Sequence, residues 1–241
     1  MGRLFLIRHA QASFLEENYD KLSTLGETQA RRLGQHWAQQ NIVFDGVCSG
    51  PRVRHKETAK IVGGVCRDAG IPFPEPVEIA EFDEYQAEAV LKQGLPGLVE
   101  SDSKIRELHR EYQNSTKPEQ RLVNFEKMFE MLITKWVDGE VVLPGVESWP
   151  EFCARADRGL SQYMSANGHG KRLAIFGSAG LIGVAMQRAL HLSPQDTLGT
   201  TWMVRNSSFS EFLFSNTDDR FSLSTFNSFP HLDEPSLMTY R

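Results

Sequence analysis

"GRLFLIRHAQAS", residues 2–13, is the stretch that decides the fold expected of this chain. Four consecutive apolar residues from Leu4 to Ile7 are typical of a short buried strand. This strand runs directly into Arg8 and His9, two polar side chains that a buried strand does not require. In open α/β sheets, ligands bind outside the carboxyl ends of the strands. We therefore expect Arg8 and His9 to face a binding site at a strand end.

The composition is that of an ordinary globular protein. Its 241 residues favour one large domain, or one domain with a sizeable insertion. Hydrophobic residues make up 40% and charged residues 24%, which suffices for a buried core. The net charge of −5 argues against a nucleic-acid partner but is compatible with a small basic pocket. No apolar run approaches the about 20 residues of a membrane span, so we expect no membrane partner either.

Cysteine usage and the N-terminus both indicate a cytoplasmic protein. Cys48, Cys66 and Cys153 are scattered and form neither a CxxC pair nor a metal-binding spacing, which is typical of a reducing compartment. Arg8 and His9 interrupt the N-terminal apolar run too early for a signal peptide. The pattern thus predicts a cytoplasmic location and no metal.

Strands and helices are expected to alternate along most of the chain. Short apolar runs predict strands at 4–7, 44–48, 77–80 and 173–176, and a closing pair at 208–214 and 221–226 with a turn near Asp218 and Asp219. Capping-box spacings predict helix starts at Thr24 and Ser148, and another helix ends at Gly70. This order favours an α/β fold of three layers, in which a mainly parallel sheet carries helices on both faces.

One segment departs from this alternation. Residues 103–137 are highly charged, and their spacing predicts two helices broken near Pro118. The second helix places Leu122, Phe125, Phe129, Leu132, Ile133 and Trp136 on one apolar face. We interpret residues of about 100–140 as a helical cap inserted into a single domain that spans 1–241. Caps above a rigid sheet commonly select the substrate.

The strand ends carry groups that suit a phosphate. Guanidinium groups bind phosphate through two parallel hydrogen bonds, and a helix start offers unpaired backbone N–H groups. A neutral imidazole can attack phosphorus, and a carboxylic acid can protonate the leaving oxygen. The residues in question are Arg8 and His9, then Arg52 and Arg54, then Glu81, then Ser178 and Ala179. The competing interpretation is that Arg8 pairs with a surface acid and His9 hydrogen-bonds within a turn.

Several of these stretches resemble a known family. "LFLIRHAQAS" is similar to the Arg-His-Gly opening of the histidine phosphatase superfamily, which includes the cofactor-dependent phosphoglycerate mutases. The similarity continues in order through LSTLGETQA (22–30), SGPRVRHKETA (49–59), IAEFDEY (79–85), GVESWPEFCAR (145–155) and the pair Asn206-Ser207. The resemblance implies a phosphoglycerate-mutase-like fold over nearly the whole chain.

The resemblance also implies roles for individual residues. His9 becomes the phosphohistidine, Arg8 and Arg54 clamp the transferring oxygens, and Glu81 is the proton-donating acid. Asp83 and Glu84 are neighbouring alternatives for that acid. Such a site needs no metal or cofactor, because two arginines and a second histidine neutralise the phosphoryl charge.

The main departure from the family is at Ser178. The resemblance places the second histidine there, and a hydroxyl brings no positive charge. Losing such a contact costs on the order of 2–4 kcal/mol, or ~10²–10³ in rate. Among the other histidines, His231 in the C-terminal tail is a candidate to fold over the pocket, whereas His55 is expected to point into helix packing.

Three functions are compatible with these residues. The first is a phosphomonoester hydrolase that acts through phospho-His9 on a small phosphorylated substrate. The second is a weak or inactive relative that binds a phosphorylated ligand or inorganic phosphate, which Ser178 favours. The third is a phosphoglycerate mutase, for which no local signal of protected transfer to a second hydroxyl is found.

Overall fold

The computed structural model describes residues 1–13, 20–217 and 220–240, so the predicted turn at Asp218 and Asp219 lies outside the described residues. The chain forms two compact units. The larger unit consists of Met1–Glu84 and Arg155–Arg241, and the smaller one of Tyr85–Ala154.

A six-stranded mixed sheet is the centre of the larger unit. Its strands are β1 (Gly2–Arg8), β2 (Gly46–Ser49), β3 (Val77–Glu78), β4 (Arg172–Gly177), β5 (Phe209–Phe214) and β6 (Phe221–Ser228), in the order β3-β2-β4-β1-β5-β6. The first four strands in this order are parallel, and β5 and β6 are antiparallel. The predicted mainly parallel α/β sheet is confirmed.

The register of the parallel strands brings their carboxyl ends to one edge. Arg8 of β1 pairs with Gly177 of β4, and Ser49 of β2 pairs with Phe176. The chain therefore leaves β1, β2 and β4 at neighbouring points, which is the placement that the strand-end argument requires.

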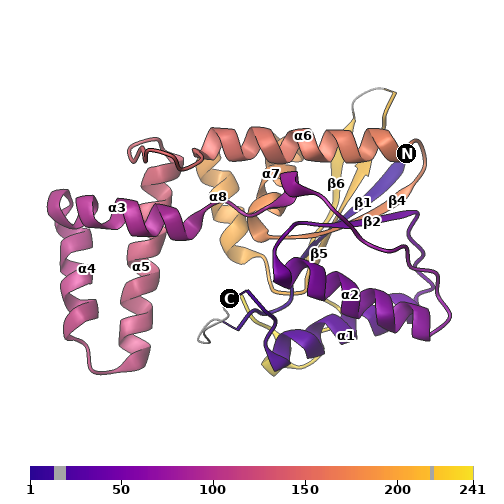
Figure 1. Ribbon diagram of the computed structural model, residues 1–241, viewed down its shortest axis with the longest axis horizontal. Helices are drawn as coiled ribbons and strands as arrows, with labels where there is room; N and C mark the ends of the chain where they lie inside the picture. The colour runs from indigo at the N-terminus through magenta and orange to yellow at the C-terminus, as the bar shows by residue number, and fades with distance from the viewer. Residues whose placement is uncertain (14–19, 218–219, 241) are drawn as a thin grey trace. The chain divides into compact units, whose positions relative to one another are not determined.

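Helices cover both faces of this sheet (Figure 1). Two of them, α1 (Thr24–Gln39) and α2 (Val53–Asp68), lie on one face, and α6 (Trp149–Asn167) and α7 (Ala179–Leu190) lie on the other. The predicted three-layer arrangement is thus confirmed. The short helix α8 (Pro194–Met203) follows α7 and was not expected from the sequence.

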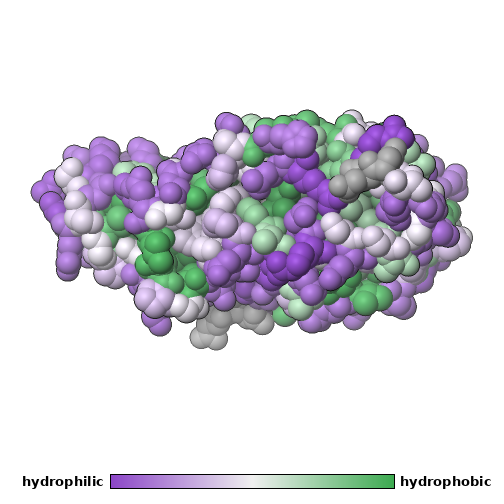
Figure 2. All heavy atoms as spheres, turned by 90° about the horizontal axis from the view of Figure 1, so that it is seen from above, coloured by the Kyte–Doolittle hydropathy of each residue, from purple (hydrophilic) through white to green (hydrophobic). Residues whose placement is uncertain are grey.

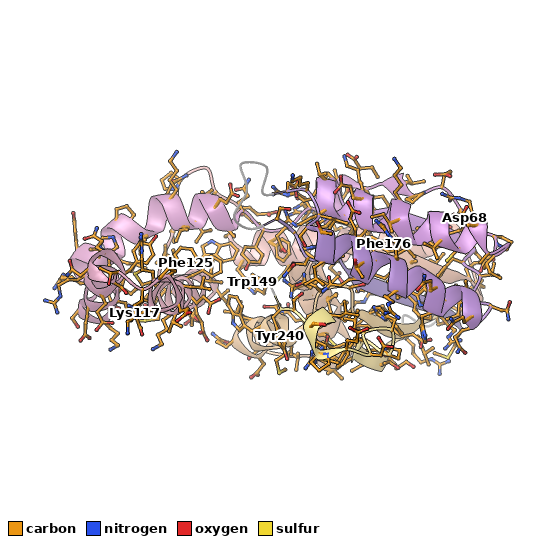
Figure 3. The ribbon with its side chains drawn as sticks, turned by 90° about the horizontal axis from the view of Figure 1, so that it is seen from below. Asp68, Lys117, Phe125, Trp149, Phe176 and Tyr240 are labelled. Atoms are coloured by element: carbon orange, nitrogen blue, oxygen red, sulfur yellow. The ribbon has the colours of Figure 1, made fainter. Side chains whose placement is uncertain are left out.

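Trp37 of α1 is the centre of the core between the sheet and the α1–α2 layer. Its side chain is fully buried, and its ring centroid lies 4.9–6.3 Å from those of Phe5, Phe44, Phe176 and Phe209. Figure 3 shows Phe176 beneath these helices. Edge-on packing of aromatic rings adds to the free energy gained by burying their area.

The predicted helix start at Thr24 is confirmed, and Ser23 is its N-cap, because its extended backbone lets its hydroxyl oxygen accept from the Gly26 amide at 3.0 Å. Two predicted strand boundaries differ from the observed ones. The strand predicted at 44–48 starts at Gly46, and the one predicted at 77–80 ends at Glu78. A short 3₁₀ turn, η1 (Ala80–Phe82), takes the place of its last residue.

The smaller unit contains α3 (Ala87–Ser101), α4 (Ser103–Asn114) and α5 (Pro118–Val137). Two helices separated at Pro118 were predicted, whereas α3 was not. The predicted face of α5 is wrong in its first half, because Leu122 is exposed and Met128 is buried instead. Phe125 and Phe129 are only half-buried, and their rings stack on each other with centroids 6.2 Å apart. These two apolar residues of the predicted face therefore contact each other and are not part of the buried core.

Gly26 marks the closest approach of α1 to the segment that follows His9. A Cβ atom at Gly26 would lie 2.1 Å from the carbonyl oxygen of Gln11, so a side chain there must displace backbone. We expect Gly26→Ala to lower the free energy of unfolding by about 1–3 kcal/mol. Gly64→Ala in α2 is the matched control, because a Cβ there meets nothing within 4 Å, and it should stabilise by about 0.5–1 kcal/mol. Urea denaturation measures both, and equal stabilities would contradict this packing.

The surface drawn in Figure 2 is mostly hydrophilic, with apolar side chains in small separate patches. Such a surface is usual for a chain with 24% charged residues. No helix in the described part of the chain is long and apolar enough to cross a bilayer.

Candidate functional site

His9 lies directly after β1, and its backbone is held from two sides. The His9 amide donates to the carbonyl oxygen of Gly177 at 2.8 Å. The His9 carbonyl accepts from the Asn206 side-chain amide at 3.3 Å and from the Ser207 amide at 3.2 Å. Strand β4 and the segment before β5 therefore fix the imidazole, which is only 7% exposed.

The hydrogen bonds of His9 define its tautomer. Nδ1 lies 2.8 Å from the carbonyl oxygen of Ala10, and a carbonyl only accepts, so Nδ1 carries the proton. Nε2 then holds a lone pair and accepts from Nε of Arg54 at 3.2 Å. Burial, reinforced by Arg54 and Arg8, holds the pKa of His9 well below its usual value. The ring is therefore neutral at physiological pH, which is the nucleophilic form of histidine.

Arg54 reaches His9 from the first turn of α2. Its guanidinium is buried, and Nη1 donates to Oδ1 of Asp20 at 2.6 Å. The other oxygen of Asp20 accepts from the Val53 amide at 2.8 Å. A carboxylate thus lies between a guanidinium and the start of a helix, both of which stabilise negative charge. The same groups would bind two oxygens of a phosphate.

Arg8 and Ser178 lie at the same edge of the sheet. The Arg8 guanidinium donates to the Val204 carbonyl through Nη1, and its amide donates to the Ser208 carbonyl at 3.0 Å. Ser178 is fully buried and is the N-cap of α7, where its hydroxyl oxygen accepts from the Leu181 amide at 3.4 Å. Ala179 is the first residue of that helix. The predicted helix start is therefore present next to the strand end that holds His9.

The predicted acid lies in η1. The Glu81 carbonyl accepts from Nη1 of Arg155 at 2.7 Å, whereas its carboxylate has no hydrogen bond or ion pair among the described residues. Asp83 is engaged, because Nε of Arg52 donates to its Oδ1 at 2.5 Å. His9 and Arg54 are thus hydrogen-bonded to each other, whereas the Glu81 carboxylate has no hydrogen bond to either.

The structure also places the two other candidate histidines. His55 is fully buried, and its ring centroid is 5.5 Å from that of His9, so it borders the site. Its helical spacing to Ala59 and Val62, both buried, is the signal that could have placed it. His231 is buried as well, but its ring faces Ser207 and stacks on Phe209. Sequence reasoning also missed Asp20, which has no local motif to identify it.

The buried histidines predict a loss of stability in acid. Burial, with His36 close by, lowers the pKa of His231 to about 3. The unfolded chain therefore binds this proton at a higher pH than the folded one, so stability is complete above about pH 6.5 and falls as the pH drops toward 3. His231→Phe should make the decline shallower by up to about 1.4 kcal/mol per pH unit. His169→Phe, at an exposed position, is the control. Urea denaturation at pH 4.5, 5.5 and 7.5 measures the free energy of unfolding of each variant. If His231→Phe loses stability with falling pH as steeply as the wild type, the prediction is wrong.

The described residues contain no group of three or more His, Cys, Asp or Glu side chains placed to hold a metal ion. The chain matches the family model of the histidine phosphatase superfamily (branch 1) over residues 4–89, a segment that includes His9, Arg54 and Glu81. This segment of the chain is therefore similar to that superfamily, and it carries the strand end and the helix start that hold His9 and Arg54.

Solved structures extend the fold similarity to almost the whole chain. A phosphoserine phosphatase mutant from Entamoeba histolytica, in complex with phosphoserine, has 18% identity and a TM-score of 0.62, and the match covers 96% of this chain and 100% of that one. Mycobacterial glucosyl-3-phosphoglycerate phosphatase with VO₃ has 17% identity and a TM-score of 0.59, with 94% and 99% covered. No curated protein sequence matches the chain.

Proposed function

We propose that the protein is a phosphomonoester hydrolase that works through a phosphohistidine at His9. The observation that carries this proposal is the 3.2 Å contact between Nε2 of His9 and Nε of Arg54, which puts a lone pair beside a buried guanidinium. In the first step Nε2 attacks phosphorus, so that a P–N bond forms and the P–O bond of the ester breaks. In the second step water attacks phosphorus, the P–N bond breaks and inorganic phosphate leaves.

The roles of the surrounding groups follow from their positions. We propose that Arg54, whose Nε donates to Nε2 of His9, and Arg8, which precedes His9, provide guanidinium donors to the phosphoryl group, together with the start of α7 at the neighbouring strand end. Donors that are fixed before the reaction stabilise the charge of the transition state without reorganisation. Once Nε2 is bound to phosphorus it no longer accepts from Arg54, and the donor turns to a phosphoryl oxygen.

Glu81 is the acid that we propose for the leaving alcohol. Its carboxylate has no partner among the described residues, whereas the carboxylate of Asp83 is paired with Arg52. In the first step the protonated Glu81 gives its proton to the ester oxygen, and in the second it takes one from water. Glu84 is the other alternative in this segment.

The relatives support a small phosphorylated substrate. The Entamoeba histolytica protein was crystallised with phosphoserine and with 3-phosphoglyceric acid, and the mycobacterial one with inorganic phosphate. We propose that the helical insertion predicted at about 100–140 selects the substrate. The buried thiols of Cys48 and Cys66 support a reducing, cytoplasmic location.

Trapping of the phosphoenzyme tests this function. The protein is mixed with a generic aryl phosphate and quenched within the first turnovers, and the N-terminal peptide is analysed by mass spectrometry. We expect one acid-labile phosphate on His9 and none in His9→Gln. Turnover of the aryl phosphate with no phosphate on His9 would contradict the mechanism.

A second candidate function is phosphate binding without turnover. It is favoured by Ser178, whose buried hydroxyl caps α7 where the family resemblance places a histidine. In that case inorganic phosphate should raise the melting temperature by ligand linkage while the aryl phosphate stays intact. Appearance of activity in Ser178→His, starting from none, would support this candidate, and brisk wild-type turnover would eliminate it.

A further inference from the structure

His55 is a buried polar side chain with no partner in the structure. It is fully buried, and neither Nδ1 nor Nε2 has a hydrogen-bond partner among the described residues. Leaving a buried polar group unsatisfied costs about 1–3 kcal/mol, and most buried polar groups in folded proteins are paired. An apolar side chain at this position would avoid that cost. An unsatisfied imidazole therefore indicates a partner that arrives from outside the chain.

The position of His55 indicates which partner this is. The residue follows Arg54 in the first turn of α2, and its ring centroid lies 5.5 Å from that of His9 at an interplanar angle of 34°. Gly50 makes room for it, since a Cβ atom there would lie 2.5 Å from Nδ1 of His55. The ring is thus accommodated beside the nucleophile, within one side-chain length of an anion bound to Nε2 of His9.

The charges around His55 are cationic or neutral. Arg54 and Lys56 of α2 and Arg52, the N-cap of that helix, bring positive charge near the ring. His9 lies beside it after β1, and the Phe82 carbonyl of η1 lies close to it. Burial, followed by the charges of Arg54, Arg52 and Lys56, holds the pKa of His55 well below its usual value. The ring is therefore neutral in the ligand-free protein. A phosphate dianion would reverse this balance, because it adds two negative charges beside the ring.

We propose that His55 is the second imidazole of the phosphate site, which takes up a proton when a phosphate dianion binds at His9 and donates a hydrogen bond to one of its oxygens. The proton comes from solvent or from the phosphate monoanion. His55 thereby supplies the cationic donor that Ser178 lacks, from α2 instead of from the end of β4. The proposal rests on the proposed function of the site, and it assigns a ligand contact to a residue outside the predicted set.

Nitrogen NMR of the imidazole rings tests this proposal on the wild-type protein. The ¹⁵N-labelled protein is titrated with inorganic phosphate at pH 7.5, and His55→Gln assigns the resonances of His55. We expect the His55 nitrogens to move from the pattern of a neutral ring to that of an imidazolium at saturation, while those of the exposed His169 stay in place. A His55 that remains neutral in the saturated complex overturns the inference and leaves the proposed function intact. Failure of phosphate to bind at all would contradict both.

Variants of His55 provide a second measurement. His55→Leu should weaken phosphate binding about 10- to 100-fold, because it removes a hydrogen bond to a charged group. Calorimetry in two buffers should show that the proton uptake seen with the wild type is lost in this variant. Its melting temperature without ligand should not fall, since the variant removes an unsatisfied buried group. Wild-type phosphate affinity and wild-type proton uptake in His55→Leu would overturn the inference.

Discussion

Replacing His9 with alanine is expected to lower kcat for hydrolysis of an aryl phosphate by at least about 10⁴-fold. The variant loses the imidazole whose Nε2 lone pair accepts from Arg54, so the proposed phosphohistidine cannot form. The fold should survive, because the backbone bonds of His9 to Gly177 and Ser207 do not involve the side chain. Phosphate binding should also persist, since Arg54 and the start of α7 remain.

The control for this variant is His169→Ala, which removes an exposed histidine and should leave kcat unchanged. Steady-state release of the aryl alcohol measures both variants, and a thermal scan checks their folding. Equal residual activity in His9→Ala and in the wild type would show that His9 is not the nucleophile, and the phosphohistidine mechanism would have to be abandoned.

Replacing Arg54 with methionine should lower kcat/KM about 10²–10³-fold. Methionine keeps much of the length of the side chain but removes the donors that contact His9 and Asp20. Arg54→Lys should restore only part of the loss, because a single ammonium cannot reproduce the planar fork of a guanidinium. Removal of a positive charge beside the ring should also raise the pKa of His9.

Arg52→Met is the matched control for Arg54→Met. The two arginines are two residues apart, but Arg52 is paired with Asp83 and not with His9. Its loss should therefore change kcat/KM less than about 10-fold, the range of a half-exposed ion pair. Similar losses in both variants would mean that general positive charge, and not the geometry of Arg54, determines the rate.

The sheet and most of its helices could be predicted from local patterns. Short apolar runs located β1 and β4, and turn or capping signals located α1, α5 and α6. The patterns failed where two apolar rows compete on one helix, as in α5, because only packing against a partner decides which row is buried. Residues 87–101 form α3 in spite of Pro96, which local rules place at helix ends.

The site was predictable in part, for a physical reason. The carboxyl ends of parallel strands lie at one edge of the sheet. This rule was enough to place four residues at that edge, namely Arg8, His9, Arg54 and Ser178. Asp20 and His55 have no such rule. Asp20 depends on the path of a loop, and His55 depends on Gly50 leaving room for a ring. Glu81 stays a prediction, because no hydrogen bond ties its carboxylate to His9.

The carboxylate of Asp20 has a consequence for ligand discrimination. It already occupies Nη1 of Arg54 and the Val53 amide, so an anion that binds to these two donors would have to displace it. A singly charged organic acid would replace one carboxylate by another and gain little binding free energy from the exchange. A doubly charged phosphoryl group would gain one more charge of attraction than a singly charged acid. We therefore expect Asp20 to favour divalent over monovalent anions. The apparent affinity for each anion should be reduced by the fraction of molecules in which Asp20 holds Arg54.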